Sequence, residues 1–147
     1  MITVEHLLRG KGSSVWYVAP HVNVYVALKE MADKDVGALL VMEGEKLVGI
    51  FSERDYARKV ALKGKTSVDT PIWEIMTQTL TTVKPETTIE ECMELMTDKH
   101  IRHLPVLAND KLVGVVSIGD IVKAIISKQA GTIRDLEKYI TGADYNR

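Results

Sequence analysis

The chain contains two copies of one unit, because its sequence matches itself without a gap when residues 18–63 are shifted by 65 positions. The run KLVG occupies residues 46–49 and returns at residues 111–114. Other identities are Val18 with Val83, Pro20 with Pro85, Met31 with Met96, Lys34 with Lys99, Val41 with Val106, Ser52 with Ser117, and Asp55 with Asp120. An internal repeat constrains the fold more than any single element does, so one architecture must serve both halves.

Each copy has the periodicity of a small α/β unit. Apolar strands are predicted at residues 15–18, 38–42 and 47–51, and again at 80–83, 104–107 and 112–116. Apolar residues at helical spacing predict a helix after Asn23 and another after Thr88, since both residues are good N-caps. A second helix in each copy begins at Ser52 or Ser117. The predicted order is β-α-β-β-α, twice.

The chain divides into four segments. Residues 1–64 are the first unit, with an N-terminal helical segment, and residues 80–130 are the second. Residues 65–79 connect the two units and include one helical turn at 71–76. Residues 131–147 are predicted as a C-terminal helical extension with an apolar stripe of Ile133, Leu136 and Ile140. We expect this extension to cover a dimer surface or a groove on a partner.

Composition narrows the class of protein. The 147 residues carry 19 Lys and Arg against 20 Asp and Glu, a net charge of −1, which gives no general attraction to nucleic acid or anionic lipid. The single cysteine, Cys92, excludes an internal disulfide and favours a reducing compartment. Neither a signal peptide nor an apolar run long enough to span a membrane is expected. These features predict a soluble cytoplasmic protein.

The pattern Gly, two apolar residues, Ser, two residues, Asp marks the passage from strand to helix in both copies. It runs from Gly49 to Asp55 and from Gly114 to Asp120. Taken alone, the serine is a helix cap and the aspartate completes a capping box. The same geometry also suits a nucleotide, because a helix N-terminus attracts phosphate and a carboxylate accepts from both ribose hydroxyls. A glycine at the strand end admits a ligand or another backbone. Recurrence inside one unit favours the nucleotide.

With these two segments, the chain resembles a tandem cystathionine-β-synthase (CBS) domain pair, or Bateman module, of the stand-alone type. The resemblance covers about residues 4–130 and also rests on RHLPV at residues 102–106 and WEIMT at residues 73–77. It implies two units related by a pseudo-twofold axis, with two clefts for AMP, ADP, ATP, S-adenosylmethionine or NAD(H). It also implies a homodimer formed through the helices of the units.

The resemblance assigns residues to each cleft. In the first, Asp55 would hold the ribose, Arg54 and Arg102 would face phosphate with Ser52, and Ile101 would lie against the adenine. The first cleft comprises Ser52, Arg54, Asp55, Thr77, Thr79, Thr81, Ile101, Arg102 and His103. The second comprises Lys11, Ser14, Trp16, Val36, Gly37, Ser117, Gly119 and Asp120. Glycines replace the two arginines in the second cleft, so we hypothesise that the first is the better phosphate site.

Other readings stay open for several residues. His103 fits a ligand contact or a dimer surface, and Trp16 fits an adenine stack or a packed strand. Cys92 lies on an apolar helical stripe and is expected to be a core thiol. The remaining histidines lack metal-binding spacing, so no metal is expected; they are His6, His21 and His100.

No catalytic constellation is evident in the sequence, neither a Ser-His-Asp set nor a P-loop lysine motif. We therefore expect a regulatory binding module that senses an adenine nucleotide and signals to an effector protein. The alternatives are a dimerisation scaffold without ligand and, with less support, a nucleotide-hydrolysing enzyme.

Overall fold

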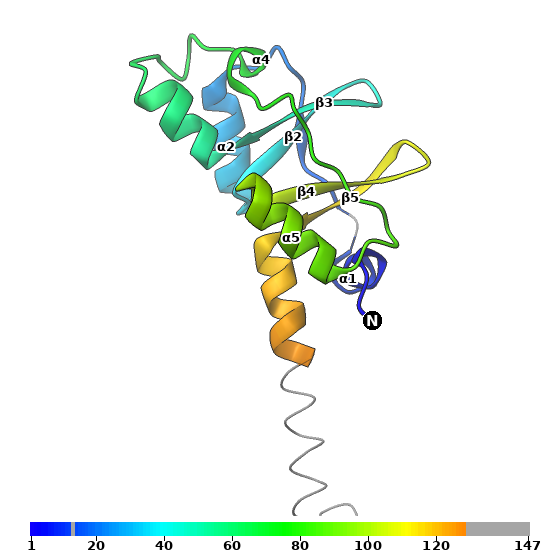
Figure 1. Ribbon diagram of the computed structural model, residues 1–147. Coiled ribbons are helices and arrows are strands. Elements are labelled where there is room, and N and C mark those ends of the chain that lie inside the picture. Colours follow the sequence, from blue (N-terminus) through cyan, green and yellow to red (C-terminus); the bar gives the residue numbers. More distant parts are fainter. Residues whose placement is uncertain (13, 129–147) are drawn as a thin grey trace, which may run out of the picture.

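The computed structural model describes residues 1–12 and 14–128, and it shows two repeats with matching elements (Figure 1). The first repeat comprises β1 (Tyr17–Val18), α2 (Val24–Lys34), β2 (Ala38–Glu43), β3 (Lys46–Ser52), α3 (Glu53–Asp55) and the π-helical turn η1 (Tyr56–Ala61). The second comprises α5 (Ile89–Lys99), β4 (His103–Ala108), β5 (Lys111–Ser117) and a helix over residues 118–128. Two further helices, α1 (Val4–Lys11) and α4 (Ile72–Ile75), each precede a repeat. The predicted α/β class is confirmed.

The two sheets have equivalent registers. β2 pairs antiparallel with β3, and β4 with β5, so that Ala38 faces Ser52 as His103 faces Ser117. Both ladders shift register at the same place, after Val41 and after Val106. In the first repeat, β1 adds to β2 in parallel. Each predicted inner strand is therefore confirmed, and each is a residue or two longer than expected.

The strand predicted at residues 80–83 is wrong in extent, since only a single bridge between Val83 and Val106 forms there. The equivalent strand of the first repeat is held in part by the Leu40 N–H, which donates to the Trp16 carbonyl at 3.2 Å. Leu40 corresponds to Pro105, which has no N–H to donate. The second sheet consequently has one regular strand fewer.

Both long helices begin and end alike. The Asn23 side chain accepts from the Val26 N–H at 2.9 Å, and the Thr88 hydroxyl accepts from the Glu91 N–H at 3.2 Å, so both predicted N-caps are confirmed. The helices α2 and α5 end at Asp35 and His100, with φ of 54° and 55°. The extension predicted over residues 131–147 lies outside the described residues.

The segments that lead into the repeats are exchanged between them. Val4 of α1 is buried in the core of the second repeat, and Ile72 and Ile75 of α4 are buried in the core of the first. Equivalent hydrogen bonds fix both segments: the Val4 N–H donates to the Thr87 carbonyl at 2.8 Å, and the Ile72 N–H to the Val22 carbonyl at 2.8 Å. The N-terminal helix, which the sequence grouped with the first unit, therefore packs on the second.

The two glycines that precede the Ser-x-x-Asp segments make room for these exchanged segments. A Cβ at Gly49 would lie 2.5 Å from Met76 Sδ and 3.2 Å from the Thr77 carbonyl oxygen. A Cβ at Gly114 would lie 2.7 Å from Leu8 Cδ2. The close approach of a ligand or another backbone was expected at this position, and the structure places there the side chains of Met76 and Leu8 and the backbone of Thr77.

Candidate ligand clefts

The first aspartate is a saturated acceptor. Asp55 is 8% exposed, and its Oδ2 accepts from the Ser52 N–H at 3.0 Å and the Ser52 hydroxyl at 3.1 Å. Its Oδ1 accepts from the Thr77 hydroxyl at 3.1 Å and lies 3.0 Å from Lys59 Nζ. Lys59 is tied down in turn, because it also donates to the Ile75 carbonyl at 3.1 Å. Ser52 caps the helix as predicted. This geometry agrees both with a purely structural helix cap and with a nucleotide site.

The second aspartate is bound on one oxygen. Oδ2 of Asp120 accepts from the Ser117 N–H at 2.8 Å and from Lys11 Nζ at 2.7 Å. Lys11 also donates to the Val115 carbonyl at 2.9 Å. Burial alone raises the pKa of Asp120, but the bonds from Lys11 and Ser117 together outweigh it and hold the pKa below its usual value. Asp120 is therefore a carboxylate paired with a cation that is itself hydrogen-bonded to the backbone.

Both carboxylates lie where an exchanged segment crosses the end of a strand. Thr77 reaches Asp55 from the segment after α4, and Lys11 reaches Asp120 from the end of α1. The structure thus brings together Ser52, Asp55 and Thr77 of the predicted first cleft. It likewise brings together Lys11, Ser117 and Asp120 of the predicted second.

His103 lies at the seam between the repeats. Its Cε1 and Nε2 are 3.9 and 4.0 Å from the position that a Cβ of Gly37 would take. A residue predicted for the first cleft therefore touches one predicted for the second. Burial, the largest influence, lowers the pKa of His103, and the charges of Lys11 and Arg102 lower it further against the opposing Asp120 and Glu53.

Arg54 and Trp16 already have partners. Arg54 Nη1 donates to the His100 carbonyl at 2.7 Å, which links the first Ser-x-x-Asp segment to the second repeat. Lys34 Nζ lies 4.4 Å from the centroid of the Trp16 ring, a cation–π contact, and Trp16 is 41% exposed. Of the other predicted residues, Ser14, Thr79, Arg102 and Gly119 are exposed, and Thr81, Ile101, Val36 and Gly37 are half-buried.

A groove of about 360 Å³ opens beside the second aspartate. It runs between α1 and the helix of residues 118–128, and its lining comprises His6, Leu7, Gly10, Lys11, Asp120, Lys123, Ala124 and Ser127. Sequence reasoning missed Lys123 and Ser127, although they lie three and seven residues after Asp120 on one helical face. It also missed His6, whose Nδ1 accepts from the Thr3 N–H at 3.1 Å at the start of α1.

Three further findings concern metal ligands, apolar helices and the cysteine in the part of the chain that the structure describes. Within residues 1–12 and 14–128, no three His, Cys, Asp or Glu side chains gather as a metal site would require. No helix in that part is long and apolar enough to cross a bilayer. The buried thiol of Cys92 has its pKa raised to about 11, first by burial and then by Glu91.

Known proteins match this chain over most of its length. It is 40% identical to "CBS domain-containing protein CBSX3, mitochondrial" of Arabidopsis thaliana, over 95% of this chain and 72% of that protein. A crystal structure of a CBS domain is 48% identical, with a TM-score of 0.82, covering 84% of this chain and 97% of that one.

The structure of a putative signal-transduction protein with CBS domains from Burkholderia ambifaria is 46% identical, with a TM-score of 0.84. It covers 86% of this chain and 96% of that one. The CBS domain profile itself matches twice, at residues 12–62 and 72–127. These matches coincide with the two repeats of the fold, and the chain belongs to the CBS domain family as a tandem pair.

Proposed function

We propose that this CBS pair is a regulatory module that binds an adenine nucleotide between its repeats and signals the binding to an effector protein. One observation carries the proposal. Each Ser-x-x-Asp carboxylate contacts the segment that leads into the other repeat: Asp55 contacts Thr77, which follows α4, and Asp120 contacts Lys11, at the end of α1. A ligand held by either carboxylate would therefore touch segments from both halves of the chain. AMP, ADP, ATP and NAD(H) all present the required ribose and phosphate.

The roles follow from the chemistry of the ligand. A carboxylate accepts from ribose hydroxyls, and helix N-termini with cationic side chains hold phosphate. The proposed contacts in the first cleft are Ser52, Arg54, Asp55, Thr77, Thr79, Thr81, Ile101, Arg102 and His103. Those in the second are Lys11, Ser14, Trp16, Val36, Gly37, Ser117, Gly119 and Asp120.

Signalling requires that the ligand prefer one packing of the repeats. A ligand shifts an equilibrium only through different affinities for the two states. The seam offers groups whose packing such a ligand would change, because His103 lies against Gly37 and Arg54 reaches His100 across it. We expect no catalysis by this chain, and turnover of ATP by the pure protein would contradict that expectation.

Thermal unfolding with AMP, ATP, NADH and S-adenosylmethionine tests the proposal. A specific ligand at 100 times its dissociation constant adds about 2.7 kcal/mol to stability, which raises Tm by several degrees in a domain of this size. Guanosine nucleotides at the same concentration are the control. The absence of a shift with every adenosine ligand would contradict the proposal.

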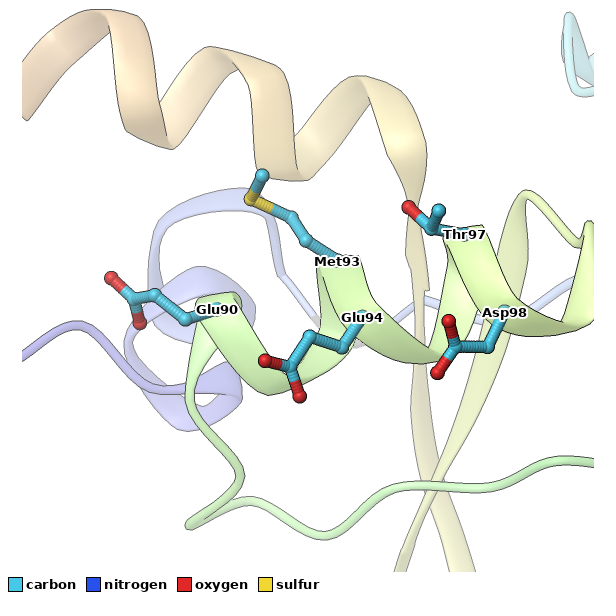
Figure 2. Close-up of a pocket in the computed structure, with 5 residues that line it drawn as sticks. All are labelled: Glu90, Met93, Glu94, Thr97 and Asp98. Atoms are coloured by element: carbon cyan, nitrogen blue, oxygen red, sulfur yellow. The ribbon is translucent and has the colours of Figure 1, made fainter.

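A second candidate, a dimerisation scaffold, is favoured by apolar residues on exposed helix faces. Val122 and Ile126 of the helix over residues 118–128 are 46% and 58% exposed, and Met93 of α5 is 39% exposed. Figure 2 shows Met93 and Thr97 pointing toward that helix, while Glu94 and Asp98 point away from it. A shallow groove of about 380 Å³ lies here. We propose that a homodimer forms through these helices, which light scattering of the Val122→Glu variant would test.

We also propose a cytoplasmic location. The single cysteine is buried in the core of the second repeat, as suits a reducing compartment. Fractionation of cells that express the full chain, with Cys92 tested for alkylation after denaturation, would check both the location and the redox state.

A further inference from the structure

We propose that two copies of this chain pair head to tail, so that the helices of the second repeat in each copy pack on the helices of the first repeat in the other. The inference rests on the homodimer proposed above and adds which helices meet. In the second repeat these are α5 and the helix over residues 118–128, and in the first they are α2 and η1. The partner surface is therefore a different face of the same chain.

The outer helix face of the second repeat is bulky and apolar. Met93, Val122 and Ile126 are 39%, 46% and 58% exposed. Met93 points from α5 toward the helix that carries the other two residues (Figure 2). In a single copy these side chains meet water, and their burial against a partner is favourable.

The equivalent face of the first repeat is lined by small side chains. The offset of 65 residues puts Ala57 at the position of Val122 and Ala61 at that of Ile126, and both alanines are exposed. A bulky face packed on a small one fills space. Two small faces would leave gaps between them, and two bulky faces would hold each other apart. The sizes of these side chains therefore favour contact between unlike repeats.

One residue further along, the difference in size is reversed. Leu62 follows η1 and is 80% exposed, and its equivalent in the second repeat is Ser127. Because the two positions are equivalent, a head-to-tail contact brings the large side chain of one copy to the small one of the other. Each face therefore has both a projection and a recess, and the other face has them at the opposite positions.

The charges beside these apolar residues differ between the repeats as well. The exposed carboxylates of α5 are Glu90, Glu91, Glu94 and Asp98. The equivalent residues of α2 are Tyr25, Val26, Lys29 and Asp33, so only the last keeps the charge. Arg58 of η1 and Lys63 after it add exposed positive charge to the first repeat. Contact between two copies of α5 would oppose like charges, whereas contact with the first repeat brings carboxylates to cations.

A twofold axis closes the head-to-tail arrangement. When a residue of the first repeat contacts a residue of the partner's second repeat, the same axis repeats the contact with the two roles exchanged. Both helix faces of both copies are therefore covered in one dimer. A head-to-head dimer would instead pack each face on its own equivalent, which is the contact that size and charge disfavour.

Charge-swap variants of the full chain test the orientation by sedimentation equilibrium. Ala61→Glu alters the face of the first repeat, and Ile126→Lys or Ile126→Glu alters that of the second; both positions are exposed, so we expect the variants to fold. Each variant alone should dimerise about tenfold more weakly than the wild type, because both contacts of a head-to-tail dimer include the altered face. Lys46→Glu, at an exposed position in β3, is the control and should dimerise as the wild type does.

Mixtures of the variants give the decisive comparison. A head-to-tail dimer of Ala61→Glu with Ile126→Lys has one native contact and one contact between opposite charges. With Ile126→Glu in place of Ile126→Lys, the second contact joins like charges. We therefore expect the first mixture to dimerise about tenfold more tightly than the second. In a head-to-head dimer the two altered faces never meet, so the sign of the charge at residue 126 would make no difference.

The outcomes distinguish the orientation from the dimer itself. If the wild type is a dimer and the two mixtures dimerise equally, the head-to-tail orientation is wrong while the homodimer stands. If Ala61→Glu alone dimerises as the wild type does, the first repeat lies outside the interface and the orientation is again wrong. If the wild type is a monomer, the proposed homodimer fails and the orientation fails with it.

Discussion

His103 of the second repeat lies directly over Gly37 of the first, with its Nε2 4.0 Å from the place of a Gly37 Cβ. Gly37 occupies the position that Arg102 takes in the other repeat, and His103 the position of Ala38. The seam is therefore asymmetric, because a Cβ at Gly37 would meet Glu53 Oε1 of its own repeat at 3.0 Å and the ring of His103 from the other repeat at 3.9 Å. The lowered pKa of the buried His103 predicts that the stability of the protein depends on pH.

Stability is predicted to fall on mild acidification because of His103. Burial holds the folded-state pKa below the unfolded value of 6.5, so the unfolded chain takes up a proton first as the pH drops. The contribution is full above the unfolded pKa and is lost as the pH falls from there toward the folded pKa. Urea unfolding at about pH 8 and about pH 5.5 measures the difference.

The variant His103→Asn should reduce that pH dependence, whereas His21→Asn, at an exposed position, should leave it as in the wild type. An unchanged difference in His103→Asn would show that other groups carry the effect. The lowered pKa of Asp120 affects stability at a lower pH than His103 does. The stability that it contributes is present above the usual pKa of 3.8 and is lost in stronger acid.

Alanine at Gly49 or Gly114 is predicted to destabilise the fold by about 1–3 kcal/mol through overpacking. The added Cβ would meet Met76 Sδ at 2.5 Å in one case and Leu8 Cδ2 at 2.7 Å in the other. Gly119→Ala is the control, since its nearest contact is an ordinary 3.6 Å. Chemical denaturation measures all three, and equal stability for Gly49→Ala and Gly119→Ala would contradict the prediction.

Truncation of Val4 is predicted to loosen the second repeat and not the first. Val4 is fully buried among the core residues of the second repeat, and Val4→Ala removes two methyl groups at a cost of about 2 kcal/mol. Hydrogen exchange followed by mass spectrometry should show faster exchange first in β4 and β5. Faster exchange confined to β2 and β3 would mean that α1 does not hold the core described for it.

Cys92 is predicted to be inert in the native protein. Its thiol is buried, and with a pKa of about 11 it stays protonated near neutral pH. A thiol reagent such as Ellman's reagent should react only as fast as the chain opens, and rapidly in denaturant. Fast reaction of the native protein, with unchanged circular dichroism, would place the thiol at the surface.

The repeat made most of the fold predictable from sequence. The offset of 65 residues located the inner strands and the helices, and the polar residues Asn23 and Thr88 located the caps. The missing strand at residues 80–83 was also within reach, because Pro105 cannot supply the N–H that Leu40 supplies in the first repeat. The residue types within an element were sufficient to predict the inner strands, the helices and their caps, because these elements depend mainly on their own residues.

The contacts of the clefts were less predictable, since they join segments far apart in the chain. Arg54, which is proposed to contact the ligand, donates in this structure to the carbonyl of His100, a residue in the left-handed conformation. Lys59, by contrast, lies only four residues after Asp55, and this local ion pair was missed although helical spacing allows it. The exchange of leading segments follows an offset of 68 rather than 65, which pairs Leu8 with Met76 and escapes a search for one constant shift.

That exchange means that neither half of the chain is a self-contained folding unit. A cut in the loop that precedes α4 would separate each leading helix from the core in which it packs. The first fragment would keep α1, which packs in the core of the second repeat, and the second fragment would keep α4, which packs in the core of the first. The two repeats are packed as the subunits of a segment-swapped dimer would be, although they belong to a single polypeptide. Its halves should therefore complement each other as split fragments, each insoluble or unfolded alone and restored on mixing.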